Sequence, residues 1–239
     1  MSDHTARERY LSGEYRQANP TWDQEDSPWK AALVRELIHS AGIRAASIAE
    51  VGCGAGGVLA ELRGAFPRAQ LSGFDIAPDA AQFWRQHAAA GVEYTLGDFF
   101  EASREPRYDV ILLLDVLEHL ADPMGFLARL RPRAEHFIMH IPLDLSALSV
   151  LRETPLLYVR RKVGHIHYYT KSLAVALLED CGYQVLAARY TGAAFNAPQR
   201  TWKTRAASLA RRLVYALSKD FGVRLLGGET LLVLARARS

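Results

Sequence analysis

Residues 48–56 read IAEVGCGAG, an apolar strand that carries one acid and runs into a loop with glycine at every second position. Glycine has no Cβ, so it tolerates the positive φ that a strand-to-helix turn often needs. It also lets the backbone come close to a bound nucleoside. The stretch therefore predicts the first strand–loop–helix unit of a nucleotide-binding α/β fold.

The loop also satisfies the dinucleotide-binding pattern G-x-G-x-x-G through Gly52, Gly54 and Gly57. Asp75 lies 21 residues beyond Gly54, where an acid can hold a ribose. This alternative does not explain Glu50, two residues before the first glycine, or the strand expected at 229–235. We therefore favour a different nucleoside cofactor.

Two further apolar segments end in polar residues suited to a nucleoside. Residues 71–74 are followed by Asp75, whose carboxylate can accept hydrogen bonds from both ribose hydroxyls. Residues 92–96 run into a glycine and then Asp98 and Phe99, which offer a carboxylate for an exocyclic amine and a ring to pack on a purine. The ends of successive strands thus present side chains suited to the ribose and the base of a nucleoside.

A fourth apolar segment, residues 108–114, is a continuous run of the kind that is buried on both faces of a sheet. It is followed at once by D-V-L-E-H at residues 115–119. The four segments in this order resemble the class I S-adenosylmethionine-dependent methyltransferases, most closely the group with V-L-E-H after the fourth strand. The resemblance extends over about residues 27–190.

The resemblance implies that S-adenosylmethionine is the cofactor and S-adenosylhomocysteine the product. The family often has aspartate at the first acidic position, where this chain has glutamate, one methylene longer. The residues that the resemblance places around the cofactor are Glu50, Gly52, Cys53, Gly54, Gly56, Asp75, Ile76, Asp98, Phe99 and Leu114.

Alternating strands and helices predict a Rossmann-like, doubly wound α/β fold, with a mainly parallel seven-stranded sheet, an antiparallel last strand and helices on both faces. After a proline at residue 142 the pattern is less regular as far as residue 164. The expected strands are 47–51, 70–74, 92–96, 108–114, 135–141, 183–190 and 229–235, and the expected helices are 27–40, 56–64, 78–89, 122–130 and 171–181.

The chain has 239 residues, 49% of them apolar, which fits a single methyltransferase domain. We divide it into an N-terminal lid and helix (1–40), a cofactor-binding core (41–141), and two substrate-side insertions (142–170 and 195–228). Two cysteines give no disulfide framework and suggest a reducing compartment. With no apolar signal core at the N-terminus, we expect a cytoplasmic protein.

Methyl transfer from a sulfonium needs alignment of the acceptor and, for a hydroxyl, removal of a proton. Histidine is the natural proton acceptor near neutral pH. His119 follows the fourth strand, while His165 and His167 would lie on one side of an extended segment together with Tyr169. We take these three histidines as the catalytic candidates, with His165 contacting the substrate. Because the histidines have no carboxylate at ligand spacing, we expect no metal.

These residues favour O-methylation of a small molecule, with N- or C-methylation, a lipid-linked acceptor and a non-catalytic cofactor-binding module as alternatives.

Aromatic residues in the first 30 positions could form a lid over the cofactor. A net charge of +3 does not indicate nucleic acid. A basic amphipathic helix at 200–219 could touch an anionic membrane weakly, although such helices more often pack on the sheet. The sequence leaves the oligomeric state open.

Overall fold

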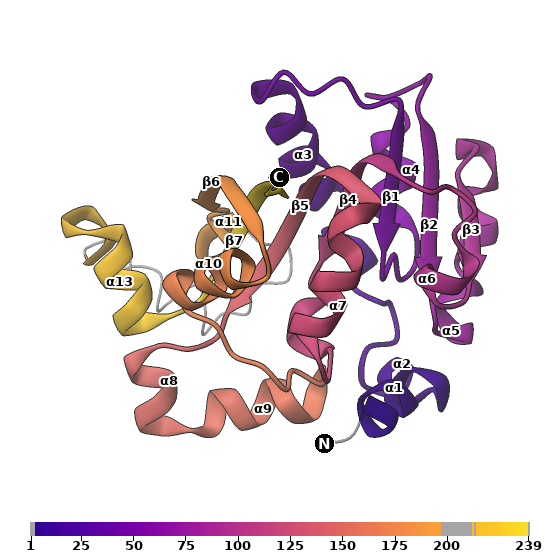
Figure 1. Cartoon of the computed structure of the whole chain (residues 1–239). Coiled ribbons are helices and arrows are strands. Elements are labelled where there is room, and N and C mark those ends of the chain that lie inside the picture. Colours follow the sequence, from indigo (N-terminus) through magenta and orange to yellow (C-terminus); the bar gives the residue numbers. More distant parts are fainter. Residues whose placement is uncertain (1–2, 197–211, 213, 239) are drawn as a thin grey trace.

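The computed structural model describes residues 3–196, 212 and 214–238, which are built around one seven-stranded sheet (Figure 1). The strand order is β3-β2-β1-β4-β5-β7-β6, with β7 antiparallel to both of its neighbours and the other pairs parallel. This confirms the predicted fold class. The strands are β1 (Ser47–Val51), β2 (Gln70–Asp75), β3 (Glu93–Leu96), β4 (Tyr108–Leu114), β5 (Ala134–Leu143), β6 (Tyr183–Tyr190) and β7 (Glu229–Ala237).

Helices surround the sheet and connect its strands (Figure 1). The α-helices are α1 (Asp3–Leu11), α2 (Glu14–Ala18), α3 (Ser27–Ser40), α4 (Gly57–Leu62), α5 (Pro78–Ala81), α6 (Phe99–Ala102), α7 (Pro123–Leu130), α8 (Ala147–Arg152), α9 (Thr154–Lys162), α10 (Lys171–Asp180), α11 (Ala193–Asn196) and α13 (Lys219–Leu226). The 3₁₀ turns are η1 (Gln24–Asp26), η2 (Trp84–Ala90), η3 (Leu117–His119) and η4 (Arg131–Arg133).

Strand β4 shows why the core has two halves. Its alternate side chains point to opposite faces, with Val110 and Leu112 packing in one apolar cluster and Ile111 and Leu113 in the other. The first cluster includes residues of α3 and α4, and the second includes residues of α7 and α10. The continuous apolar run is therefore buried on both faces, as its sequence predicts.

Helix α10 has the boundaries that its sequence indicates. The Thr170 hydroxyl accepts a hydrogen bond from the backbone N–H of Leu173 at 3.3 Å, which caps the first turn. Gly182 follows the helix with φ of 81°, a conformation that glycine adopts without strain. Helix α3 also spans the predicted residues, although Asp26 rather than Ser27 precedes its first turn.

One expectation about secondary structure was wrong, and one stretch without predicted elements contains helices. Residues 78–89 form the short α5 and the 3₁₀ turn η2 instead of one helix, and no side chain of η2 is fully buried to hold a longer helix in place. The irregular stretch after residue 142 contains α8 and α9. Helix α8 begins with a capping box in which Ser146 and Ser149 each bond the other's backbone N–H, a signal that the apolar periodicity alone does not carry.

The predicted basic helix at 200–219 lies largely outside the residues that the structure describes. Among the described residues, no helix is both long and apolar enough to cross a membrane.

Candidate functional site

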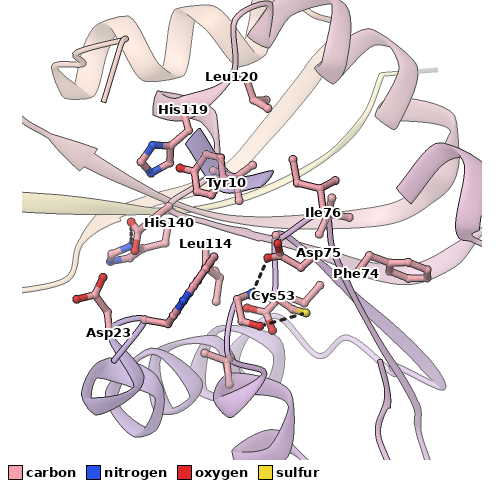
Figure 2. A pocket seen from close by; sticks show the side chains of 18 of the residues that line it. Tyr10, Asp23, Cys53, Phe74, Asp75, Ile76, Leu114, His119, Leu120 and His140 are labelled. Atoms are coloured by element: carbon pink, nitrogen blue, oxygen red, sulfur yellow. Dashed lines mark hydrogen bonds and ion pairs between the residues drawn. The ribbon is translucent and has the colours of Figure 1, made fainter. Parts of the chain in front are cut away.

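A cavity of about 680 Å³ opens at the carboxyl ends of β1, β2 and β4 (Figure 2). This is the edge at which open α/β sheets bind ligands. The cavity is of the size that proteins use for cofactors and small substrates. It is lined by every residue predicted to contact the cofactor, which are Glu50, Gly52, Cys53, Gly54, Gly56, Asp75, Ile76, Asp98, Phe99 and Leu114.

The glycine loop between β1 and α4 needs glycine for two reasons. Gly52 and Gly56 have φ of 76° and 83°, in the left-handed region that side chains disfavour. A Cβ on Gly56 would also lie 2.6 Å from the ring of Tyr94, whose hydroxyl donates to the Gly56 carbonyl. The backbone N–H of Cys53 donates to the Phe74 carbonyl at 3.0 Å, so the loop is also tied to β2.

Asp75 ends β2 and is bonded to the loop beside it. One carboxylate oxygen accepts the backbone N–H of Gly54 at 2.8 Å (Figure 2). The other accepts the backbone N–H of Ala77 at 2.9 Å. Burial raises the pKa of Asp75, and these two N–H groups partly oppose that shift. A carboxylate has about four lone-pair sites, so both oxygens can still accept hydrogen bonds from a ligand.

Glu50 lies near the end of β1 with only 2% of its surface exposed, and its Oε2 atom has no hydrogen-bond partner among the described residues. Burial raises its pKa to about 8, a shift that the ammonium of Lys30 reduces and the carboxylate of Asp75 increases. Burial therefore favours the neutral acid over the carboxylate. A buried polar atom without a partner is a group that a bound ligand can satisfy.

Asp98 and Phe99 lie at the start of α6 and line the cavity. Asp98 caps this helix by accepting the backbone N–H of Phe100 at 2.9 Å, and its second oxygen lies 3.4 Å from Nη1 of Arg7. The Phe99 ring is buried, with its centre 5.1 Å from that of Phe74 in an edge-to-face arrangement. Asp98 is thus a helix cap whose outer oxygen is paired with the N-terminal segment.

Residues 3–26, the N-terminal segment, contribute aromatic side chains to the cavity wall. Tyr10, Tyr15 and Trp22 form a cluster with ring centres 4.7 to 6.5 Å apart, and all three line the cavity. Tyr10 also meets the ring of His119 edge-on at 5.8 Å. Arg9 fastens the segment by donating to the carbonyls of Arg161 and Lys162 at the end of α9. The aromatic residues expected to cover the cofactor therefore adjoin its predicted position.

Two of the three candidate histidines meet at the cavity. His119 and His165 both line it, with ring centres 4.9 Å apart. His165 Nδ1 lies 2.6 Å from Oδ2 of Asp144, while burial lowers the pKa of His119 to about 3. His167 is not among the lining residues, and its ring stacks on Tyr169.

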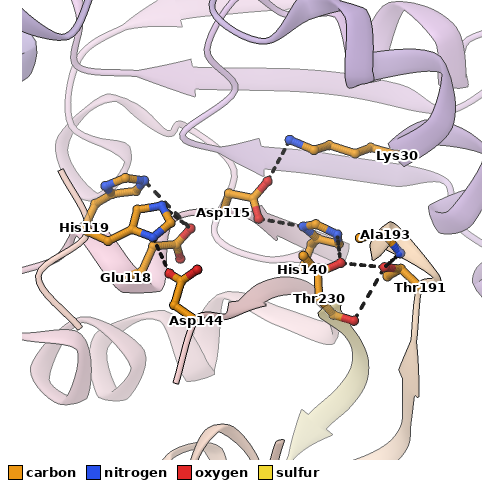
Figure 3. Close-up of polar contacts among 10 residues, drawn as sticks. Lys30, Asp115, Glu118, His119, His140, Asp144, Thr191, Ala193 and Thr230 are labelled. Atoms are coloured by element: carbon orange, nitrogen blue, oxygen red, sulfur yellow. Dashed lines mark hydrogen bonds and ion pairs between the residues drawn. The ribbon is translucent and has the colours of Figure 1, made fainter. Parts of the chain in front are cut away.

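Glu118 lies close to both histidines, and Figure 3 shows it beside His119. Its Oε1 atom is 3.7 Å from Nε2 of His119 and 3.9 Å from Nε2 of His165. Burial and the carboxylate of Asp115 raise the pKa of Glu118 well above its usual range. The histidines therefore do have carboxylates beside them, from Glu118 and Asp144, contrary to the expectation from the sequence.

A second set of polar contacts, which the sequence did not predict, links residues that line the cavity (Figure 3). Lys30 Nζ lies 2.7 Å from one oxygen of Asp115, and His140 Nδ1 lies 2.6 Å from the other. His140 Nε2 is in turn 2.8 Å from the Thr230 hydroxyl. Burial disfavours the charge of Asp115, but His140 and Lys30 together lower its pKa. Two sequence signals were available, since lysine is unfavourable in the first turn of a helix and histidine is unusual within a buried strand.

The strand order, the glycine loop and the strand-end carboxylates together define a class I methyltransferase fold with a nucleoside-sized cavity at its functional edge. Residues 19–188 match the family model described as "Methyltransferase domain", so the chain belongs to that family. The predicted resemblance to class I S-adenosylmethionine-dependent methyltransferases is thereby confirmed.

Among curated proteins, the chain is 36% identical over 93 residues to the ubiquinone biosynthesis O-methyltransferase of Serratia proteamaculans, a match that covers 36% of this chain and 37% of that protein. It is 30% identical over 100 residues to the malonyl-[acyl-carrier protein] O-methyltransferase of Anoxybacillus flavithermus, covering 41% of this chain and 37% of that protein. The chain thus spans little more than a third of the length of these two relatives.

Among solved structures, the chain is similar to the plantazolicin methyltransferase BpumL in complex with a desmethyl analogue and S-adenosylhomocysteine, with a TM-score of 0.64 and 17% identity. The match covers 98% of this chain and 94% of that one. A structure of the Haloferax volcanii Trm112 methyltransferase activator in complex with a methyltransferase gives a TM-score of 0.66 at 17% identity, covering 98% of both chains. At this identity the likeness establishes the fold.

Proposed function

We propose that the protein transfers the methyl group of S-adenosylmethionine to a hydroxyl oxygen of a small-molecule acceptor, releasing S-adenosylhomocysteine. The observation that carries the choice of oxygen is His165, held by Asp144 and placed beside His119 on the cavity wall. A hydroxyl acceptor must lose a proton during transfer, and imidazole is the side chain suited to assist that loss near neutral pH. The curated relatives named as O-methyltransferases support this choice.

The donor would occupy the part of the cavity beside the glycine loop. Asp75 has free lone pairs for the two ribose hydroxyls, while Asp98 and Phe99 would hold the adenine amine and pack on its ring. Displacement of Arg7 from Asp98 costs little, because exposed ion pairs contribute about 0–1 kcal/mol. Glu50, Gly52, Gly54 and Gly56 would surround the ribose and the methionine part.

The acceptor would lie between the donor's sulfur and the two lining histidines. Its oxygen lone pair forms the new bond to the methyl carbon, the bond from carbon to sulfur breaks, and the sulfonium becomes a neutral thioether. The proton of the hydroxyl leaves on the histidine side of the cavity. The aromatic N-terminal segment would exclude water while the reactants are aligned, an alignment worth up to about 7–11 kcal/mol.

Two measurements test the proposal. Calorimetric titration with S-adenosylmethionine and S-adenosylhomocysteine should show binding of both. Mass spectrometry of mixtures with small phenols, carboxylic acids and amines should then show methylation of an oxygen acceptor. His165→Ala should lower turnover and leave the affinity for S-adenosylhomocysteine unchanged. Absence of heat with both donor and product would refute the proposal, and turnover restricted to amines would refute the choice of oxygen.

A further inference from the structure

We propose that Glu118, His119 and His165 form a binding site for one divalent transition-metal ion, which holds the acceptor oxygen for methylation. This inference rests on the proposed O-methylation and names the group that would activate the acceptor. It also replaces the sequence-based expectation of no metal, which assumed that no carboxylate lies beside the histidines. In the structure, Oε1 of Glu118 lies 3.7 Å from Nε2 of His119 and 3.9 Å from Nε2 of His165.

Three potential ligand atoms converge from two distant segments of the chain. One ligand atom from each of Glu118, His119 and His165 lies within 4.8 Å of the other two. Glu118 Oε1 is the common neighbour, 3.7 Å from one Nε2 and 3.9 Å from the other. Ligands about 2.1 Å from a tetrahedral ion lie roughly 3.4 Å apart, so the cluster needs to contract by only a few tenths of an ångström at its two measured contacts.

The distances distinguish an ion from a hydrogen-bonded cluster. Separations of 3.7 and 3.9 Å are too long for a hydrogen bond between nitrogen and oxygen. Neither oxygen of Glu118 has a hydrogen-bond partner among the described residues, although the side chain is fully buried. Burying a carboxyl group without partners is costly, and a cation bound to it would offset that cost.

Asp144 supports this cluster by contacting the other ring nitrogen of His165. It lies 2.6 Å from Nδ1 of His165, which fixes the proton on Nδ1 and leaves the lone pair of Nε2 facing Glu118. Metal-binding histidines commonly donate their other ring N–H to a carboxylate in this way.

The backbone keeps the two ligand segments in register. The Glu118 carbonyl accepts hydrogen bonds from the N–H groups of Ile166 and His167 at 2.8 and 3.1 Å. His165 therefore sits at a fixed position relative to Glu118 and His119, although the two segments are more than 40 residues apart. Such positioning by backbone bonds provides the rigid support that a metal site requires.

The donor set indicates the kind of ion. Two imidazole nitrogens and one carboxylate oxygen suit Zn²⁺, Fe²⁺, Co²⁺ or Mn²⁺, whereas Mg²⁺ and Ca²⁺ prefer ligand sets made only of oxygen. Three protein ligands also leave at least one coordination position open. His119 and His165 both line the cavity, so an acceptor in the cavity could reach an ion that they hold.

An ion in this position would lower the pKa of a bound acceptor hydroxyl, as metal ions do for bound water. The hydroxyl would lose its proton to water as it binds the ion, before the reactants are aligned, so with an ion bound His119 and His165 would act as ligands and not as proton acceptors. The lone pair of the acceptor oxygen would then form the bond to the methyl carbon as the bond from carbon to sulfur breaks. The charge lost by the sulfonium balances the charge lost by the acceptor anion.

The test measures metal binding directly. Protein stripped with a chelator is titrated calorimetrically with ZnCl₂ and with CoCl₂, and the absorbance of bound Co²⁺ is followed during the second titration. We expect one ion per chain and a Co²⁺ spectrum that changes when catechol is added. Glu118→Gln and His165→Ala should each weaken Zn²⁺ binding at least tenfold, about 1.4 kcal/mol. His87→Ala, a histidine in η2 outside the cavity lining, should bind Zn²⁺ as the parent does.

The inference would be overturned if the stripped protein does not bind one ion per chain. It would also be overturned if Glu118→Gln and His165→Ala bind Zn²⁺ as tightly as the parent does. If Glu118→Gln does not fold, as judged by circular dichroism, Glu118→Asp and His165→Ala decide the matter. Titration of the same stripped protein with S-adenosylhomocysteine separates the two proposals. Heat from that titration without metal uptake refutes the metal site alone and leaves the methyltransferase proposal standing.

Discussion

The ammonium of Lys30 lies 2.7 Å from a carboxylate oxygen of Asp115, and Asp115 has φ of 58°, which is rare for a residue other than glycine. The conformation turns the chain at the end of β4 and directs the carboxylate toward both Lys30 and His140. A strained residue persists where surrounding contacts determine its conformation. The pair thus joins helix α3 to the functional edge of the sheet.

Replacement of this lysine tests the strength of the contact. Lys30→Met should lower the free energy of unfolding by roughly 1–3 kcal/mol, because it leaves Asp115 without its cationic partner. The effect should be below that of a fully buried pair, since 27% of the Asp115 side chain is exposed and His140 remains beside it. Urea unfolding measures the change.

A surface pair provides the matched control. Lys171 lies 3.2 Å from Asp220, with side chains 33% and 54% exposed. Lys171→Met should therefore change stability by less than about 1 kcal/mol. Equal effects of the two lysine substitutions would show that the Lys30 contact contributes no more than a surface pair.

The stability of the protein without cofactor should fall as pH rises, because of Glu50. Its pKa is about 8 in the folded protein and near 4.5 when solvated, so folding favours the protonated form. The stabilising difference is fully present below the unfolded pKa and is lost as pH rises from about 4.5 to 8. Lys30 lowers this pKa and Asp75 raises it, so both contribute to the profile.

Glu50→Gln removes this titration while keeping the shape of the side chain. The variant should be more stable than the parent by roughly 3–5 kcal/mol at pH 8, and the two should differ by less than about 1 kcal/mol at pH 5. Urea unfolding at both pH values measures the difference. A constant difference between the variant and the parent across this range would contradict a raised pKa for Glu50.

Asp75→Ala should weaken binding of S-adenosylhomocysteine by about 1–3 kcal/mol, because the ribose loses charged hydrogen bonds and the glycine loop loses its contact at Gly54. Calorimetry measures the affinity. Asp109→Ala is the control, since Asp109 accepts the backbone N–H groups of Ala46 and Ser47 at the opposite end of β1. It should reduce stability but not affinity, and unchanged affinity in Asp75→Ala would refute the ribose role.

Asp144→Asn should lower turnover about 10–100-fold, because the amide no longer fixes the ring of His165 as the carboxylate does. The affinity for S-adenosylhomocysteine should stay at the parent value, since Asp144 does not line the cavity. Steady-state kinetics and calorimetry test both parts. Asp180→Asn, at the end of α10, should change neither quantity, and a parallel loss of affinity in Asp144→Asn would indicate a general folding defect.

Much of the fold could be predicted because its signals are local. The apolar run 108–114, the glycines at 52, 54 and 56, and the Thr170 cap each act through neighbouring residues, and the structure confirms the elements that they predict. The expected helix at 78–89 failed because continuing an α-helix there depends on burial against the core, which a local pattern does not contain.

That the proposed cofactor-binding residues line one cavity could also be anticipated from the sequence. In a parallel sheet the carboxyl ends of the strands lie at one edge. Recognition of the strands therefore predicts that Glu50, Asp75 and Asp98 lie near one another, and all three line the cavity. The glycine loop needed only the conformational freedom of its own residues. For this half of the cavity, residue type and strand order together were sufficient.

Only the tertiary structure decided the polar contacts on the side of the cavity where we propose that the acceptor binds. Asp144 and His165 are 21 residues apart, Asp115 and His140 are 25 apart, and Lys30 reaches Asp115 from a different helix. Each pair forms because separate chain segments pack at one end of the sheet, and no periodicity records which side chains will face each other there. Side-chain pairs of this kind depend on packing geometry, whereas strands and helix caps depend on neighbouring residues. The sequence therefore determined the strands and caps by itself, and only the tertiary structure decided the side-chain pairs.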